Sequence, residues 1–248
     1  MPVIEKGRYR VRWAVTAEEV GRALALRALA FRGGKDGVGG PEGDAFDTRC
    51  RHALIEEAAT GDPVATFRLL PLPSGADLGQ SYSAQYYDLS ALVAYPGRMI
   101  ELGRFCLHPD RHDPDILRLA WGAITRAVDD EGAGLLFGCS SFKGTDAGAY
   151  RDAFALLRDR HLAPKRWRPR VKAPRVFRFG RRRAGVATDV RQALLRRPPL
   201  LRTYIAMGGW VSDHAVVDAE LGTLHVFTGL EIGRIPPARA RALRLVAA

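Results

Sequence analysis

The stretch that most constrains the fold of this chain runs from Met99 to Pro109, because it places two charges inside an apolar, strand-like run. Glu101 and Arg104 lie three positions apart. On a regular strand this spacing sends two side chains to opposite faces, since the alternation has a period of two residues. Gly103 lies between them and is typical of a β-bulge, whose extra residue would bring both charges to one face.

Two interpretations of this charged strand remain open from the residues alone. Burying a charge costs several kcal/mol unless it is paired, so Glu101 and Arg104 need a reason to be there. One reason is a catalytic carboxylate with a partner. The other is a structural ion pair.

The remaining patterns predict a mixed α/β protein. Thr16 and Glu19 form a capping-box sequence at the start of an amphipathic helix that ends near Gly33. We predict strands at 9–15, 52–57, 64–70, 99–109, 133–142 and 223–232, and helices at 17–32, 113–132, 147–161 and 189–197. The run at 133–142 fits a buried strand that is parallel to a neighbour. The predicted organisation is one domain over 1–248, with a core at about 8–165 and a basic C-terminal extension at about 166–248.

The charge balance predicts an anionic partner. The net charge is +11, and about a dozen basic residues lie between Arg158 and Arg183 against the single acid Asp159. Nucleic acid, anionic lipid and an acidic protein would all fit. A nucleic-acid-binding protein is therefore one alternative, although no known DNA-binding motif is present. No apolar run approaches the roughly 18 residues that a membrane span needs.

Cysteine and histidine usage predicts a cytoplasmic protein without a metal site. The three cysteines, at 50, 106 and 139, are too few and too far apart for a disulfide framework or a C-x-x-C site. The N-terminus lacks an apolar secretory segment. His108 and His112 are four residues apart, and we favour exposed or locally bonded histidines over a metal pair.

Further charges at semi-buried positions accompany the opening stretch. They are Arg27 in the first helix, Asp44 and Asp47 in the following loop, and Arg68 within a strand. Each alone would be a surface charge or a salt bridge. Together with Glu101 and Arg104 they resemble the charged signature of the acyl-homoserine-lactone synthases, which have the acetyltransferase-like (GNAT) fold, a mixed β-sheet flanked by helices.

Longer stretches resemble a sister family, the ornithine N-acyltransferases of bacterial ornithine-lipid synthesis. These stretches are Phe46-Asp47-x-x-Cys50-x-His52, Thr66-x-Arg68-Leu69-Leu70, Glu101-Leu-Gly-Arg-Phe-Cys-Leu-His-Pro109, Leu136-Phe-Gly-Cys-Ser-Ser-Phe-x-Gly-Thr-Asp146, His161-Leu-Ala-Pro164 and Pro198-Pro-Leu-Leu-x-x-Tyr204. They span roughly residues 25 to 220.

The resemblance implies transfer of a 3-hydroxy fatty acyl group from an acyl carrier protein thioester to the α-amine of L-ornithine. Glu101 would be the general base, with a pKa raised by its apolar strand, and Arg104 would organise the pocket. A backbone N–H near Phe105 would hold the thioester oxygen, and Ser141 or Ser140 would protonate the leaving thiolate. Asp44 and Asp47 would bind the amines of ornithine, and Arg68 or Arg104 its carboxylate. Arg27 completes the predicted substrate site.

The segment after the charged strand bears on the acyl donor. Coenzyme-A-dependent relatives have a glycine-rich pyrophosphate loop there, whereas this chain has Arg111-His-Asp-Pro-Asp-Ile116. Acidic residues at a helix N-terminus repel phosphate. We therefore expect an acyl carrier protein docked on the Arg158–Arg183 segment and no cofactor. The same segment, with the apolar run 200–207, is expected to touch anionic lipid at the inner face of the membrane. An acyl-homoserine-lactone synthase, or an N-acyltransferase for another amino acid, remains an alternative.

Overall fold

The computed structural model describes residues 4–33, 42–181 and 189–247, and it divides into two compact units. Unit 1 comprises Met1–Pro71, Ile100–Ala133 and Pro237–Ala248, and unit 2 comprises Leu72–Met99 and Gly134–Pro236. The predicted boundary between the core and the C-terminal extension, near residue 165, does not coincide with any position at which the chain passes from one unit to the other. The basic segment belongs to the same unit as the residues from 134 onward, and the chain returns to unit 1 at its end.

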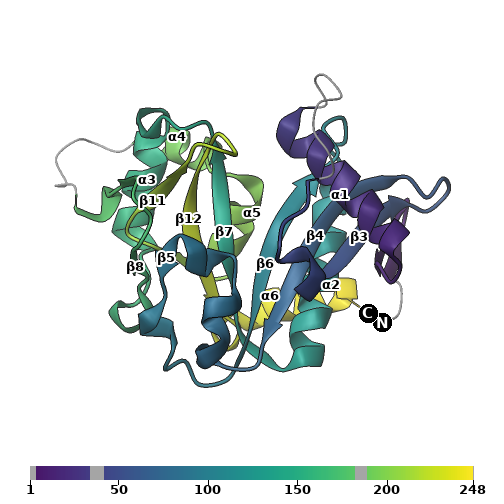
Figure 1. Ribbon diagram of the computed structural model, residues 1–248, viewed down its shortest axis with the longest axis horizontal. Helices are drawn as coiled ribbons and strands as arrows, with labels where there is room; N and C mark the ends of the chain where they lie inside the picture. The colour runs from purple at the N-terminus through teal and green to yellow at the C-terminus, as the bar shows by residue number, and fades with distance from the viewer. Residues whose placement is uncertain (1–3, 34–41, 182–188, 248) are drawn as a thin grey trace. The chain divides into compact units, whose positions relative to one another are not determined.

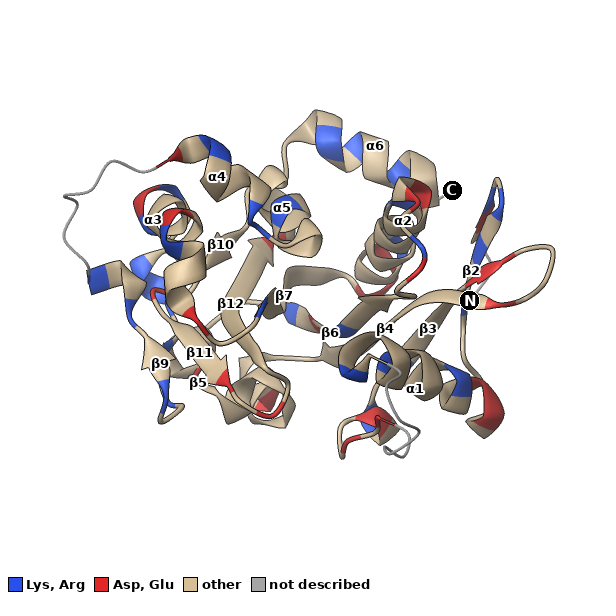
Figure 2. Ribbon diagram, turned by 90° about the horizontal axis from the view of Figure 1, so that it is seen from above, with Lys and Arg blue, Asp and Glu red and all other residues tan. Residues whose placement is uncertain are grey.

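The sheet of unit 1 has the strand order β1–β2–β3–β4–β6. Its strands are β1 (Ile4–Lys6), β2 (Tyr9–Trp13), β3 (Arg51–Glu57), β4 (Pro63–Leu72) and β6 (Arg98–Leu107). The first three pairings are antiparallel, and β3 and β4 confirm the strands predicted at 52–57 and 64–70. Figure 2 shows α1 (Ala17–Arg32) on one face of these strands and α2 (Pro114–Glu131) on the other. Because helices cover both faces, β4 is buried along most of its length.

The ends of α1 and α2 follow the predicted capping chemistry. The Thr16 hydroxyl accepts a hydrogen bond from the Glu19 amide, and the Glu19 carboxylate accepts one from the Thr16 amide. Gly33 ends α1 in the left-handed conformation, with φ 75°. Asp113 caps α2, Pro114 occupies its first turn, and Gly132 ends it.

The arginine- and alanine-rich tail forms a helix that the sequence analysis did not predict. This helix, α6 (Pro237–Ala247), packs against α2 (Figure 2). A Cβ at Gly122 of α2 would lie 2.8 Å from Val246, so the glycine permits this close approach. The Arg244 guanidinium donates two hydrogen bonds to the Asp129 carboxylate, both 2.8 Å long.

The sheet of unit 2 has the order β7–β12–β11–β9, and β10 also pairs with β12. These strands are β7 (Ala133–Lys143), β9 (Val176–Phe177), β10 (Trp210–Val211), β11 (Ala215–Asp218) and β12 (Thr223–Glu231). The predicted strands at 133–142 and 223–232 are confirmed. On its β12 side β7 is antiparallel, in register from Leu135 to Lys143.

The helices of unit 2 are α3 (Arg151–Arg160), α4 (Val190–Leu195) and α5 (Pro199–Ala206), labelled in Figure 1. A two-stranded sheet joins β5 (Tyr87–Asp88) to β8 (Arg170–Val171). The core contains Phe142, Ala153, Phe154, Leu157, Phe179, Leu201, Val211, Ala215, Leu224 and Val226. In the part of the chain that the structure describes, no helix is long and apolar enough to cross a membrane.

Candidate active site

Strand β6 has an unusual backbone at the predicted position, although not at the glycine. Arg104 has a φ of 51°, and it is the one non-glycine residue with a positive φ among those described. The left-handed conformation costs an L-residue roughly 1–2 kcal/mol. Gly103 leaves room for a neighbouring side chain, because a Cβ there would lie 3.3 Å from Nε of Arg68. In this part of β6, Gly103 thus makes room for the side chain of Arg68, and the positive φ of Arg104 changes the direction of its own side chain.

Arg68, on β4, joins two carboxylates. Its Nη1 lies 2.5 Å from Oδ1 of both Asp44 and Asp47, and its Nη2 donates to Oδ2 of Asp44 at 2.9 Å. Burial alone would lower the pKa of Arg68, but the hydrogen bonds to the two aspartates outweigh burial and raise this pKa above its usual value. Arg68 is therefore a permanent cation held between two anions.

Arg27 of α1 extends this arrangement to a third carboxylate. Its Nη1 donates to Oδ1 of Asp47 at 2.7 Å, and its Nε donates to Oε2 of Glu42 at 2.9 Å. The Arg27 side chain is only 1% exposed and that of Glu42 5%. At this degree of burial, loss of one partner would leave an uncompensated charge, so the pair is strongly interdependent.

Arg104 closes the arrangement into a ring. Its Nη2 donates to Oδ2 of Asp44 at 2.9 Å, and its Nη1 lies 3.7 Å from Oε1 of Glu42. Around the ring, three arginines alternate with three carboxylates, so their formal charges cancel. We call this set the charged ring; its members are Arg27, Asp47, Arg68, Asp44, Arg104 and Glu42.

The loop that supplies the two aspartates is fixed by its own backbone. Oδ2 of Asp47 accepts a hydrogen bond from the Asp44 amide at 2.8 Å, and Oδ1 of Asp44 accepts one from the Phe46 amide at 2.9 Å. Burial would raise the pKa of both carboxyl groups, yet their bonds to arginines keep each pKa below its usual value. Because every oxygen of Asp44 and Asp47 already accepts a hydrogen bond, a substrate ammonium would have to join or replace these donors.

Glu101 is the buried carboxylate of β6 that does not belong to the charged ring; it is 5% exposed. Its charge acts on Cys50, whose pKa is raised to about 11, mainly by burial and in part by Glu101. Cys50 is therefore a protonated thiol near neutral pH rather than a nucleophile.

The chain resembles known proteins over most of its length. Residues 26–122 match the acetyltransferase (GNAT) domain model. The L-ornithine Nα-acyltransferase of Rhodobacter capsulatus is 34% identical over 230 residues, which cover 88% of each chain. The chain belongs to the L-ornithine Nα-acyltransferase family. The family member of Brucella abortus is 30% identical over 233 residues, covering 91% of this chain and 79% of that protein.

A solved structure supports the GNAT fold of this family member. The structure of FeeM, an N-acyl amino acid synthase from uncultured soil microbes, matches with a TM-score of 0.53. The match covers 92% of this chain and 94% of that one, at 9% sequence identity. At such low identity the likeness concerns the fold alone.

The structure brings together most of the residues that the sequence singled out for this acyltransferase site. Arg27, Asp44, Asp47, Arg68 and Arg104 are all members of the charged ring. Phe105 follows on β6 and stacks on Phe67, with ring centroids 6.0 Å apart. The catalytic and substrate-binding roles assigned to these residues remain predictions.

The two predicted general-acid candidates belong to unit 2 rather than to the unit that holds the ring. Both lie on β7, where Ser140 is buried and accepts a hydrogen bond from the Thr228 hydroxyl at 3.0 Å. Ser141, the next residue, is exposed. Ser140 thus has a structural partner, and the role of Ser141 in protonating the thiolate stays a prediction.

Glu42 is the ring member that the sequence analysis missed. It lies near the end of the glycine-rich segment 33–43, of which positions 34–41 lie outside the described residues. No periodic pattern surrounds Glu42. Charge counting could not have found it, because the predicted set was already balanced, with three arginines against Asp44, Asp47 and Glu101.

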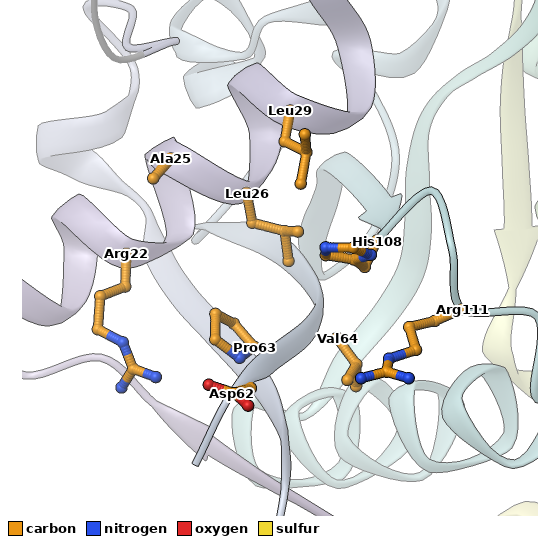
Figure 3. A pocket seen from close by; sticks show the side chains of 9 residues that line it. All are labelled: Arg22, Ala25, Leu26, Leu29, Asp62, Pro63, Val64, His108 and Arg111. Atoms are coloured by element: carbon orange, nitrogen blue, oxygen red, sulfur yellow. The ribbon is translucent and has the colours of Figure 1, made fainter. Parts of the chain in front are cut away.

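A separate pocket in unit 1, of about 410 Å³, contains one of the two histidines that we considered as a metal pair (Figure 3). His108 lies there beside Leu26 and Leu29 of α1, and its Nδ1 accepts a hydrogen bond from the Asp110 amide at 3.3 Å. This contact fits the locally bonded alternative. Within the described ranges, no group of three or more His, Cys, Asp or Glu side chains is arranged to hold a metal.

Proposed function

We propose that this protein transfers a 3-hydroxy fatty acyl group from an acyl carrier protein thioester to the α-amine of L-ornithine. The product, an N-acylornithine or lyso-ornithine lipid, is the first intermediate of ornithine-lipid synthesis. The observation that carries the proposal is the identity of 29–34% with L-ornithine Nα-acyltransferases over about nine-tenths of the chain. We place the reaction in the cytoplasm, at the inner face of the membrane, and propose that it needs no metal or other cofactor.

The electrostatics of the site support a cationic acceptor. Ornithine with both amines protonated carries two ammonium groups, which suit a site with the carboxylates of Asp44, Asp47 and Glu101. Nη2 of Arg27 is buried and makes no hydrogen bond to any described residue. We assign it, with Arg68 and Arg104, to the ornithine carboxylate.

The proposed chemistry needs one proton acceptor, one oxyanion donor and one acid. Glu101 takes a proton from the α-ammonium, directly or through a water, and the freed amine attacks the thioester carbon. The backbone N–H near Phe105 holds the oxyanion of the tetrahedral intermediate, an effect worth roughly 10²–10³-fold. Collapse of the intermediate forms the amide and expels the thiolate of the carrier protein; the Ser141 hydroxyl gives the thiolate a proton and takes up the proton that the amide nitrogen loses.

The start of α2 supports a carrier-protein donor rather than coenzyme A. The Asp113 carboxylate accepts hydrogen bonds from the Asp115 amide at 2.9 Å and from the Tyr9 hydroxyl at 3.1 Å. These bonds, led by the amide, keep the pKa of Asp113 below its usual value. An anion therefore already occupies the helix end where a pyrophosphate would bind. An acyl carrier protein would instead dock its acidic surface on the basic segment Arg158–Arg183.

The experiment that tests this function compares acceptors and donors with the purified protein. We expect N-acylornithine from ornithine and acyl carrier protein thioester, and much slower turnover with acyl-coenzyme A. Lysine, glutamine and S-adenosylmethionine serve as competing acceptors. Acyl-homoserine lactone without N-acylornithine would overturn the proposal in favour of the synthase alternative. Faster turnover with lysine or glutamine would reassign the acceptor.

A further inference from the structure

Unit 2 contains a strongly basic pocket, whose cations belong to the Arg158–Arg183 segment proposed for carrier docking but take no part in the chemical steps. The pocket has a volume of about 360 Å³. Five basic side chains line it against the single carboxylate of Asp213; its lining residues are Lys165, Arg168, Pro169, Arg170, Val171, Arg178, Arg181 and Asp213. A concave site with this excess of cations fits a small anion that accepts several hydrogen bonds, such as a phosphate group.

Most of the cationic side chains of this pocket form no ion pair with a described residue. Lys165, Arg178 and Arg181 are exposed and form no salt bridge with any residue that the structure describes. Arg168 donates to a backbone carbonyl, that of Ala163, at 2.9 Å. Asp213 is already bonded to Nδ1 of His214 at 2.7 Å, so its charge is shared with another group. The positive charge of the pocket is therefore available to a ligand.

Helix α4 of the same unit presents apolar side chains to solvent. Val190 is 45% exposed, Leu194 44% and Leu195 63%, and Arg191 and Arg196 in the same segment are also exposed. Apolar and basic side chains together on a short helix are typical of contact with an anionic membrane surface.

The apolar run expected to touch lipid, 200–207, has a different role. It forms most of α5, where Leu201 and Tyr204 are buried and the helix packs against β12. Both α4 and the segment Phe179–Arg181, which carries one pocket arginine, pack against α3. One pocket residue, Arg181, and the exposed leucines thus belong to segments that pack against the same helix.

We propose that this pocket binds the phosphate of an anionic phospholipid headgroup, while α4 supplies the accompanying apolar contact. The inference rests on the proposed function in one respect only. The function explains why the protein would bind a membrane, because its long-chain N-acylornithine product must pass into one. Headgroup binding itself requires neither ornithine nor an acyl donor. It can therefore be measured independently of the reaction.

The test is flotation of the full-length protein with vesicles of phosphatidylglycerol and phosphatidylcholine, and with vesicles of phosphatidylcholine alone. We expect binding only to the anionic vesicles. Replacing Arg178 and Arg181 together by Ala should weaken this binding about 30-fold, from the usual contribution of a basic residue at an anionic surface. The matched control replaces Arg239 and Arg241 of α6, which are also exposed, and should change binding less than threefold.

Three results would overturn the proposal. Equal losses in the two double variants would show a general charge effect without a site. A raised KM for the carrier-protein thioester in the Arg178/Arg181 variant, with unchanged vesicle binding, would assign the pocket to the carrier protein. Micromolar binding of inorganic phosphate without vesicle binding would assign it to free phosphate. Failure of ornithine acylation would leave the vesicle and phosphate measurements intact, because neither needs turnover.

Discussion

Arg104 adopts a left-handed backbone conformation and donates a 2.9 Å hydrogen bond to Asp44, sixty positions earlier in the chain. The strain at one residue of β6 is therefore coupled to a loop that precedes β3. This coupling makes the charged ring a unit whose members depend on one another, and it leads to the first two predictions.

Replacing Arg104 by Gly should destabilise the protein less than replacing it by Ala. Both changes remove the bonds to Asp44, but glycine adopts a positive φ without steric cost. We expect the free energies of unfolding to differ by about 1 kcal/mol, measured with urea. At Arg241, inside α6, the order should reverse, since Ala favours a helix over Gly. Equal stability of the two Arg104 variants would contradict the role of backbone strain.

Replacing Gly103 by Ala should disturb the charged ring from inside the strand. The new Cβ would lie 3.3 Å from Nε of Arg68 and force the guanidinium away from the two aspartates. Overpacking of this kind typically costs about 1–3 kcal/mol. Gly79→Ala is the control, because a Cβ there would meet nothing within 4 Å. If both variants melt at the wild-type temperature, the close approach of Arg68 is not a constraint.

Replacing Glu101 by Gln should stop turnover while the fold is kept. Glutamine has nearly the same shape but accepts no proton, so we expect kcat to fall about 10²–10⁴-fold. The measurements are N-acylornithine formation and the thermal unfolding curve. Glu18→Gln, at an exposed position of α1, should leave kcat unchanged. A kcat within tenfold of wild type would mean that Glu101 is a structural residue.

His225 should make the protein less stable in mild acid. Burial lowers the pKa of His225 to about 4, whereas the unfolded chain has an ordinary value near 6.5. As the pH falls from 6.5 to 4, the unfolded state takes up a proton and the native state does not, so the free energy of unfolding decreases. The loss amounts to up to about 3 kcal/mol. Urea titrations across this range should show a flatter pH dependence in His225→Phe.

The control for this pH dependence is His112, an exposed histidine. A His112→Phe variant should retain the wild-type slope, although the His225 variant also loses its contact with the Tyr87 hydroxyl. The change in the free energy of unfolding with pH, rather than its value at one pH, distinguishes the titration of His225 from lost packing. An unchanged slope in His225→Phe would exclude this residue as the source.

Residues at their ends made the helices α1 and α2 predictable from the sequence. The capping box at Thr16, the proline after Asp113 and the glycines at 33 and 132 act within one turn of the chain, so their effect can be read without tertiary contacts. The same holds for the β3–β4 hairpin. The ring arginines and aspartates were found because charges are unusual inside apolar segments and because their pattern resembles known families.

Features that depend on distant contacts were not predictable in this way. The positive φ falls on Arg104, which ordinarily avoids it, because the bonds to Asp44 and Glu42 outweigh the local preference. Glu42 has no local pattern, and its role follows from Arg27 in α1. Helix α6 is recognisable only from its packing on α2, since its arginine- and alanine-rich sequence has a weak apolar face.

The return of α6 to unit 1 has a consequence for biosynthesis. The first strands of that unit emerge from the ribosome long before Val246, which packs against Gly122, and the residues of unit 2 from 134 to 236 are translated in between. A nascent chain must therefore hold the exposed face of α2 without its cover until residues 237–247 have been translated. Termination before Pro237 would release a protein whose first unit is never completed.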